Sequence, residues 1–575
     1  MMRIKSKKAP DNQLTMRKSR WLKNIFAFGL LLFANGINAQ DQLTEDTFRI
    51  VKAYKPILID ASKIENKPSI DDSWKPETKV KYSFMNKQIP VTFDTEPIKA
   101  AKIKGEPLVK LYNGYLKAGV GNALVPFGEV YYNNLRSKEY SLGVHASYFN
   151  LREINKIKGS DMQNLQAEVF GKRFWKANTL SSRLSFNKRL FNYYGFYDLP
   201  RIDLTTKAEE DAIDQRYTRF GAETTLESTK QDSFNLRHKI SIQYAMQSNI
   251  SNIAENNFKI VGQLSQFKNQ ELYLVDALID YNKYDPQNGN TIIAVKPQIS
   301  TIGERFRVKA GLGIYANSGD ETNFHFYPLA EIKYNIIEDV LIPYAGVKGE
   351  IRRNNYFSLT TENPFLDENI LLANSNEKLN IYTGFRGTLS KDVSFNANAA
   401  YVETEGAYFF VQNTDFLRDL TPEYFVNYDN LKEFRIRGEL VYRLGDKLKI
   451  NALGEYFSFD TENEDQAWLR PEVKITTGAR YDLQEKLIIK AEIFYWGEQY
   501  ASNVSFVQNG VTLEPQTMAS KLDPIIDINI GFEYRYTKRL SAFVDFNNIA
   551  GINYQRYQNY LTQGFNVWGG LTYAF

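Results

Sequence analysis

The chain has 575 residues, enough for several ordinary soluble domains, and its formal net charge of +4 gives no reason to expect nucleic acid as a partner. It contains no cysteine, which excludes disulfides, thiolate metal sites and cysteine nucleophiles. Its 37 tyrosines and 38 phenylalanines are unusual in a chain that is polar on average. A sheet with one apolar face and one wet face accommodates both features, because every second residue is free to be polar.

The N-terminus has the layout of an export signal. A basic run, Arg17 to Arg20, precedes an apolar stretch, Ile25 to Ala34, and Ala39 is a small residue at a cleavage position. The apolar stretch is shorter than the roughly 20 residues that a membrane-spanning helix needs. The sequence therefore predicts a signal peptide at 1–39, with translation starting at Met16.

Residues 40–106 form a second predicted segment. They lack any regular alternation and are rich in proline, which removes a backbone donor and restricts its neighbour. We expect an extended, turn-rich segment that hangs in the periplasm, fills a lumen or docks on a partner protein.

Apolar and polar residues alternate along most of the chain after residue 106. In the stretch 526–536, for example, Ile, Phe and Tyr alternate with Asp, Asn, Gly, Glu and Arg. A period of two places these side chains on opposite faces of a strand. The runs have the length of about 10 residues or more that a tilted transmembrane strand requires, and rings gather near their ends. Both details favour a membrane barrel over a soluble β-sandwich.

Tight polar turns and longer links divide these strands. Barrels of this kind have short periplasmic turns, so ten such turns with both termini periplasmic predict about 22 strands, in a range of about 18 to 24. The predicted fold is all-β, an antiparallel transmembrane up-and-down β-barrel over 107–575. The predicted turns lie near Ser137, Lys176, Gln231, Asn269, Glu304, Glu338, Lys391, Asp446, Gln484 and Lys538, and the longer links near 150–160, 190–214, 351–376, 404–431 and 498–523.

The polar face of the predicted wall carries charges of both signs. They would either favour weakly the passage of anionic groups or pair across neighbouring strands. We prefer the pairing, because it is the usual way in which the interior of a barrel is satisfied. The charges expected to face the lumen are Arg305, Arg307, Lys309, Arg435, Arg437, Glu439, Glu533 and Arg535.

The sequence predicts no catalytic site, metal site or cofactor, and so no enzyme. We expect His145 on the lumen wall, His238 near a periplasmic turn and His325 in the interfacial belt, and no two of them have metal-ligand spacing. The acidic stretch 460–465 lacks the glycine and the terminal glutamate of a calcium loop, so a solvated loop is the preferred interpretation. Glycine-rich loops for phosphates or dinucleotides are missing.

The end of the chain carries a family resemblance. The apolar face of the last alternating strand consists of Phe565, Val567, Leu571, Tyr573 and Phe575. A final strand that ends in Phe resembles the membrane-assembly signal of bacterial outer-membrane barrels. Together with the stretch Leu540 to Ile549, it resembles the end of the barrel of TonB-dependent receptors, here without a recognisable plug domain.

This resemblance implies a location in the outer membrane of a Gram-negative bacterium. The implied partners are lipid, lipopolysaccharide and the barrel-assembly machinery, and the implied function is uptake of a scarce ligand such as a chelate, glycan or peptide. Residues 45–51 are faintly similar to the short TonB-contacting box, although we prefer an exposed linker. Because 40–106 is too short for the family's plug, the alternative is a plugless, non-transporting barrel. It would act as a scaffold or accessory subunit of an outer-membrane assembly or export complex, with 40–106 contacting other proteins.

Overall fold

The computed structural model describes residues 111–153, 159–195, 213–229, 236–285, 287–319, 321–337, 340–412, 423–509 and 512–575. For 503–509 and 512–517 it describes the backbone alone. The predicted signal peptide, the proline-rich segment and residues 45–51 lie outside these ranges. Within them, no helix has both the length and the apolar composition to cross a membrane.

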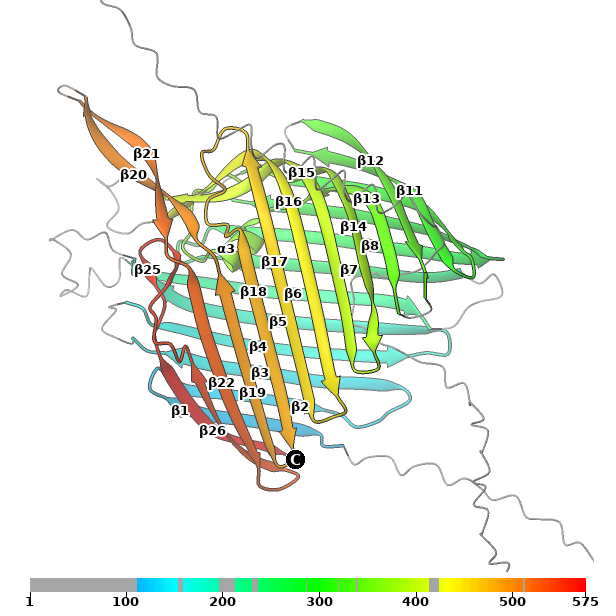
Figure 1. Ribbon diagram of the computed structural model, residues 1–575, viewed down its shortest axis with the longest axis horizontal. Helices are drawn as coiled ribbons and strands as arrows, with labels where there is room; N and C mark the ends of the chain where they lie inside the picture. Colours follow the sequence, from blue (N-terminus) through cyan, green and yellow to red (C-terminus); the bar gives the residue numbers. More distant parts are fainter. Residues whose placement is uncertain are drawn as a thin grey trace, which may run out of the picture. The chain divides into compact units, whose positions relative to one another are not determined.

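A single antiparallel sheet of 22 strands closes on itself. The first strand, β1 (Gly114–Gly121), pairs with both β2 (Leu124–Asn133) and the last strand, β26 (Asn566–Ala574). Every other wall strand pairs with its neighbours along the chain, which is the up-and-down topology (Figure 1). Closure leaves no unpaired edge for another chain to pair with. The predicted fold class and strand number are confirmed.

The remaining wall strands differ in length, and the longest stand side by side in the yellow part of Figure 1. They are β3 (Tyr140–Leu151), β4 (Met162–Phe174), β5 (Asn178–Asn192), β6 (Asp214–Ser228), β7 (Leu236–Ser248), β8 (Ala254–Lys268), β9 (Glu271–Tyr284), β10 (Asn290–Ile302), β11 (Phe306–Ser318), β12 (Thr322–Tyr334), β13 (Ile342–Arg352), β14 (Ser375–Ser390), β15 (Val393–Gln412), β16 (Tyr424–Leu444), β17 (Leu448–Thr461), β18 (Val473–Leu483), β19 (Leu487–Trp496), β22 (Ile525–Arg535) and β23 (Leu540–Asn547).

The other elements lie in the connections between wall strands. They are the helix α3 (Tyr356–Glu362), the hairpin of β20 (Gln499–Asn509) and β21 (Thr512–Leu522), and the short pair β24 (Gln555–Tyr557) and β25 (Tyr560–Leu561). The β20–β21 hairpin extends beyond the wall in Figure 1.

The two ends of the barrel have different connections. All ten predicted turns fall between consecutive strands at the end where Gly114 and Phe575 lie, although Gln231 and Glu338 themselves are outside the described residues. We call this the inner end. The long links fall at the opposite end, which we call the outer end. The link predicted at 404–431 is an exception, because β15 continues to Gln412 and β16 begins at Tyr424.

The two strands continue there because their aromatic residues pair across the sheet. Tyr408 lies opposite Tyr428, and Phe410 lies opposite Val426. Large apolar side chains in facing positions stabilise a strand pair. The predicted link 404–431 was therefore wrong at both ends, because 404–412 belong to β15 and 424–431 belong to β16.

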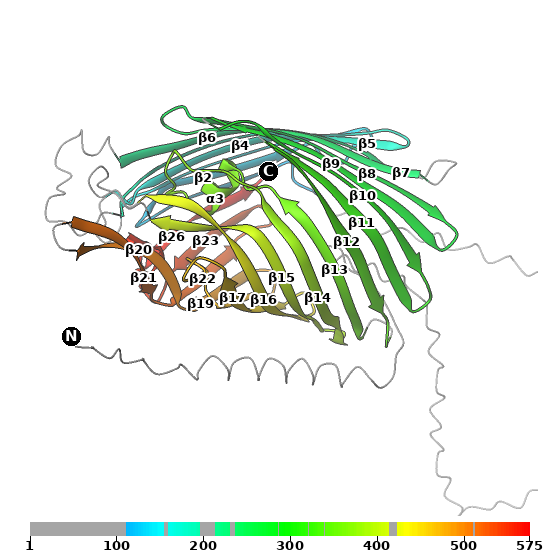
Figure 2. The same cartoon turned by 90° about the horizontal axis from the view of Figure 1, so that it is seen from above.

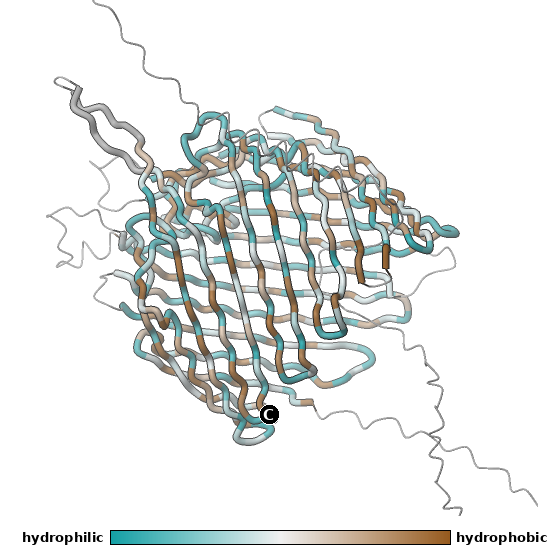
Figure 3. The backbone as a smooth tube through the Cα atoms, in the orientation of Figure 1, coloured by the Kyte–Doolittle hydropathy of each residue, from teal (hydrophilic) through white to brown (hydrophobic). Residues whose placement is uncertain are grey.

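Hydrophobic and hydrophilic residues alternate along the wall strands (Figure 3). A period of two gives the sheet one apolar and one mixed face, and the apolar side chains are the exposed ones that face outward. On β11 the outward side chains of Phe306 and Leu312 are 44% and 41% exposed, and many other apolar side chains of the wall are exposed to a similar degree. In water such a continuous apolar surface would be costly, whereas hydrocarbon suits it.

The last strand closes the barrel against β1. At this seam Gly570 lies opposite Gly119, and a Cβ on Gly570 would come within 1.9 Å of the Ala118 carbonyl oxygen. On the outward face of the same strand Leu571 and Tyr573 are 57% and 41% exposed. Phe565 and Phe575 are also exposed, and Val567 is half-buried. The assembly role predicted for these five side chains stays a prediction.

Candidate functional site

Several predicted lumen charges lie close to an opposite charge on the same or a neighbouring strand. Arg435 lies 3.5 Å from Glu433 on its own strand, and Arg437 lies 4.0 Å from Glu455 on β17. Arg307 instead donates a hydrogen bond to the Ser300 hydroxyl at 2.9 Å. These contacts are of the kind expected if the charged side chains on the inner face of the barrel pair with one another.

Of the charges predicted to face the lumen, Glu533 and Arg535 lie close together, whereas Arg305 lies outside the wall strands. Glu533 and Arg535 lie 3.9 Å apart on β22, and Lys490 lies 3.5 Å from Glu533. Arg305 lies in the inner-end turn before β11. Lys309 and Glu439 lie on the inward face of their strands, and neither forms an ion pair with a described residue.

The three histidines make ordinary contacts. His145 lies 3.2 Å from a Glu129 carboxylate oxygen and stacks on Tyr131 at 4.0 Å between ring centres. His238 lies in β7, where its backbone N–H donates to the Ser228 hydroxyl at 3.0 Å. His325 stacks on Tyr327 on the inward face of β12, rather than in an outward belt. Among the described residues, none of the three belongs to a group of acidic or histidine side chains that could hold a metal ion.

The connection between β13 and β14 packs inside the barrel with its own buried residues (Figure 2). We call residues 353–374, which include α3, the strap. In Figure 2 α3 lies inside the ring of strands. The strap holds the buried side chains of Tyr356, Leu359, Phe365, Leu366 and Ile370, which form one apolar cluster with rings of the surrounding wall. A connection of this length with its own core is typically functional rather than a passive link.

Helix α3 begins at a carboxylate supplied by the wall. Glu255 of β8 accepts hydrogen bonds from the backbone N–H groups of Tyr356 and Phe357, at 2.8 and 2.7 Å. Within the strap, Asn355 accepts a hydrogen bond from Ser358 N–H at 2.9 Å. The first N–H groups of a helix have no partner inside it, so these acceptors satisfy them. A negative charge at this end also complements the helix dipole.

Tyrosine hydroxyls of the wall hold the strap backbone on the same side. Tyr193 donates to the Leu366 carbonyl at 2.6 Å, and Tyr217 donates to the Pro364 carbonyl at 2.9 Å. Tyr284 of β9 donates in the same way to the Glu368 carbonyl. Each bond satisfies a carbonyl that would otherwise be buried without a partner.

The opposite wall holds the strap as well. Tyr424, the first residue of β16, exchanges backbone hydrogen bonds of 2.9 Å with Phe365 and Asp367. Tyr428 accepts from Ala373 N–H, also at 2.9 Å. Since β6 to β9 and β15 to β16 lie far apart around the 22-strand ring, the strap crosses the lumen at its outer end.

The loop between β23 and β26 packs beside the strap. The ring of Tyr560 stacks on Phe365 at 3.6 Å between ring centres, and Tyr557 donates a hydrogen bond to the Glu362 carbonyl. Tyr194 donates to the Leu561 carbonyl at 3.0 Å, and burial raises the pKa of Tyr194 to about 12. Two outer loops and the wall therefore form one packed layer.

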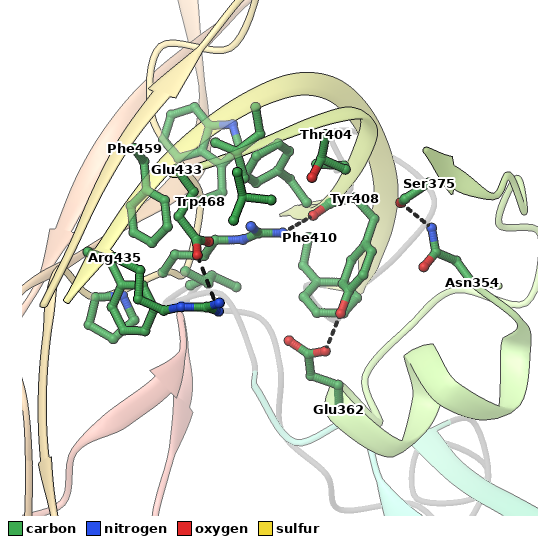
Figure 4. Close-up of a pocket in the computed structure, with 18 of the residues that line it drawn as sticks. Asn354, Glu362, Ser375, Thr404, Tyr408, Phe410, Glu433, Arg435, Phe459 and Trp468 are labelled. Atoms are coloured by element: carbon green, nitrogen blue, oxygen red, sulfur yellow. Dashed lines mark hydrogen bonds and ion pairs between the residues drawn. The ribbon is translucent and has the colours of Figure 1, made fainter. Parts of the chain in front are cut away.

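A cavity of about 310 Å³ lies between the strap and the wall strands β14 to β18 (Figure 4). We call it the strap cavity. Its lining runs from the level of Glu362 and Tyr408, whose side chains hydrogen-bond at 2.6 Å, inward along β16 to Arg435. On its outer side the buried Trp468 packs with Phe409.

Three cations of the cavity lie against aromatic rings. The Arg470 guanidinium lies 4.6 Å from the ring centre of Phe409, and the Lys474 ammonium lies 4.9 Å from that of Trp496. Arg556 lies 5.2 Å from the same Trp496 ring. Arg470 also donates to the Tyr408 carbonyl at 2.8 Å, and desolvation lowers its pKa from the ordinary arginine value. Cations over rings are held by the negative ring faces.

Reasoning from the sequence found neither Arg470 nor Arg556. Arg470 and Arg556 lie in outer loops, where single charges are common and carry no periodic signal. A signal did exist in the strap, where apolar residues recur at Tyr356, Leu359, Phe365 and Leu366 in a link that should otherwise be polar. Buried apolar residues in a loop indicate that the loop packs against something.

The fold of this barrel has been seen before, although its sequence has not been matched. No family model matches the chain, and no curated protein does. The FrpB iron transporter from Neisseria meningitidis superposes with a TM-score of 0.61 at 11% identity, covering 81% of this chain and 82% of that chain. The ferric enterobactin receptor PfeA from Pseudomonas aeruginosa, a mutant in complex with enterobactin, gives 0.60 at 12% identity, covering 80% and 81%. The siderophore receptor PirA from Acinetobacter baumannii gives 0.58 at 14% identity, covering 81% of each chain.

The chain has the barrel fold of TonB-dependent receptors. The predicted resemblance to that barrel is thereby confirmed. At these sequence identities the likeness shows a shared fold. It does not show that this chain binds the ligands of those proteins.

Proposed function

We propose that this chain resides in the bacterial outer membrane and takes part in the passage of a ligand across it. The outward apolar band supports the location, since a closed barrel with such a band satisfies its backbone in hydrocarbon. The barrel shares its fold with proteins described as transporters and receptors.

The observation that carries the proposal is the strap cavity. Three cations and several rings line it, which supports the binding of a ligand that enters the lumen. Ligand sites in proteins are concave and orient a ligand through placed polar groups. This cavity is concave and combines aromatic rings with many charged and polar side chains. Passage requires that the strap move, because it crosses the lumen at the outer end.

A deletion strain tests passage directly. Cells that lack the chain, cells that carry it and cells that carry a form with the strap cross-linked to β7 through introduced cysteines are compared for accumulated metals and organic solutes. We expect at least one scavenged solute to fall in the deletion strain and to recover with the wild-type chain only. Equal solute profiles in all three strains would contradict the proposal.

One observation favours the alternative, a non-transporting barrel. The strap is fastened to both sides of the wall, through Glu255, Tyr217 and Tyr424 among others, as expected of a permanently closed lumen. Such a barrel would serve as a scaffold or accessory subunit of an assembly or export complex. Purification in mild detergent separates the two proposals: partners in fixed stoichiometry that contact 40–106 support the scaffold, and a lone barrel excludes it.

A further inference from the structure

Three separate segments bring a positive charge to the strap cavity. Arg470 comes from the loop between β17 and β18, Lys474 from the start of β18, and Arg556 from β24. They are close enough for the charges of Arg470 and Arg556 to act on Lys474. Each also lies over a ring, and Arg470 and Lys474 are half-buried, whereas Arg556 is exposed.

The other charges of the cavity are already paired. Arg352 pairs with Glu377, and Arg435 pairs with Glu433. Carboxylates do act on these cations from nearby: Glu455 and Glu362 on Lys474, and Glu433 and Glu362 on Arg470. Glu362 itself accepts the Tyr408 hydroxyl hydrogen bond at 2.6 Å.

Among the described residues, Arg470, Lys474 and Arg556 form no ion pair. Glu455 lies opposite Lys474 in the strand register, and the ion pair that it does form is with Arg437 at 4.0 Å. The cavity therefore holds more positive than negative charge.

Gathering like charges in a partly dry cavity is unfavourable unless an opposite charge joins them. A ligand with two or more negative groups would satisfy the three cations together. The rings of Phe457, Trp496 and Tyr557 already lie against Lys474 or Arg556. Phe459, which is half-buried in the same lining, offers a flat apolar surface for a planar part of the molecule. The cavity of about 310 Å³ suits a molecule of one or two rings.

We propose that the strap cavity is a binding site for a small organic polyanion with a planar face, recognised by Arg470, Lys474 and Arg556. This inference rests on the proposed function and names the class of ligand. The cavity is covered on its outer side by Trp468 and the strap, and its lining continues inward along Arg435 and Lys474. The ligand therefore sits on the lumen side of the strap.

Binding of benzene-1,3,5-tricarboxylate to the full chain in detergent tests the proposal, with tryptophan fluorescence and calorimetry as readouts. Two probes separate charge from shape: benzene-1,3,5-tricarboxamide is planar but neutral, and propane-1,2,3-tricarboxylate is charged but has no ring. We expect saturable binding of the planar trianion, at least tenfold weaker binding of the ringless one, and none of the amide.

Variants assign the binding to the three cations. Lys474→Gln with Arg556→Gln should raise the Kd of the planar trianion at least tenfold, and Arg556→Lys alone should largely preserve it. Lys490→Gln, which removes a paired lumen cation, is the matched control and should leave the Kd unchanged. The proposal is overturned if the trianion does not bind, or if the double variant binds as the wild type does. Such a failure leaves the deletion-strain test of passage unaffected, so the two proposals fail separately.

Discussion

Gly114 and Phe575 exchange two backbone hydrogen bonds of 3.0 Å each, and so join the first residue of the barrel wall to the last residue of the chain. The ring of Phe575 lies over Gly114, where a Cβ would come within 2.2 Å of it. The final rung of the barrel thus depends on a glycine and on a terminal aromatic residue. The pairing of Phe575 with Gly114 completes the closure of the sheet.

Deletion of Phe575 should therefore reduce the folded fraction of the barrel several-fold. The deletion removes both hydrogen bonds of the last rung and an outward-facing ring. Electrophoresis with and without heating measures the fraction that migrates as a folded barrel. Phe385→Ala is the control, because it removes an outward ring of similar exposure, 40% against 45%, and leaves the rung intact. Equal folded fractions for the two variants would count against a closing role.

Glu255→Gln should loosen the strap while leaving the barrel folded. The variant removes the charge and one of the two oxygens that accept from Tyr356 and Phe357 N–H, so a buried donor loses its partner. Leaving a buried polar group unsatisfied costs about 1–3 kcal/mol. Hydrogen exchange over 353–374 should speed up accordingly. Glu304→Gln, in an inner-end turn, should change nothing, and a strap that exchanges at the wild-type rate would contradict this role for Glu255.

Tyr217→Phe and Tyr193→Phe should each weaken the strap by about 1 kcal/mol, since each removes one hydrogen bond and keeps the ring. Because both tyrosines hold the same segment, their effects should not add independently. Limited proteolysis within the strap measures this opening. Tyr536→Phe, on an exposed outward ring, serves as the control. Resistance to proteolysis equal to that of the wild type in the double variant would refute the anchoring.

Alkaline pH should release the loop layer. Burial raises the pKa of Tyr194 to about 12, above the ordinary value of about 10, so the folded layer favours the neutral phenol. This contribution to stability is fully present below pH 10 and is lost as the pH rises towards 12. Tyrosinate absorbance and strap proteolysis, followed together, should change in that window. In Tyr194→Phe the pH dependence should be weaker, and identical curves for both proteins would exclude Tyr194 as a contributor.

The wall was predictable because its two signals are local. Alternation with a period of two fixes which face each side chain occupies, and tight turns such as those near Asn269 and Gln484 count the strands. Positive φ angles at these two residues show why they suit a turn. The extension of β15 and β16 was not predictable in this way, because Tyr408 to Phe410 break the simple alternation and are stabilised by the strap.

The strap and its cavity depend on contacts between residues far apart in the chain. Glu255 contacts Tyr356 across 101 positions of the chain, and Arg556 contacts Trp496 from a separate outer loop. No spacing in the sequence indicates that these residues come into contact. The buried residues within 353–374 indicated that this link packs against something, but not that it crosses the lumen.

The strap closes the outer mouth of the lumen. Labelling of introduced cysteines in intact cells tests this closure most directly. The chain has no cysteine of its own, so Thr404→Cys in the strap cavity, Asp465→Cys in an outer loop and Asp446→Cys in an inner-end turn each report one position. With a membrane-impermeant maleimide, we predict rapid labelling at position 465 and none at 446. Position 404 should be labelled only when 356–370 is replaced by a short glycine–serine linker. Labelling at 404 as fast as at 465, with the strap intact, would contradict the account.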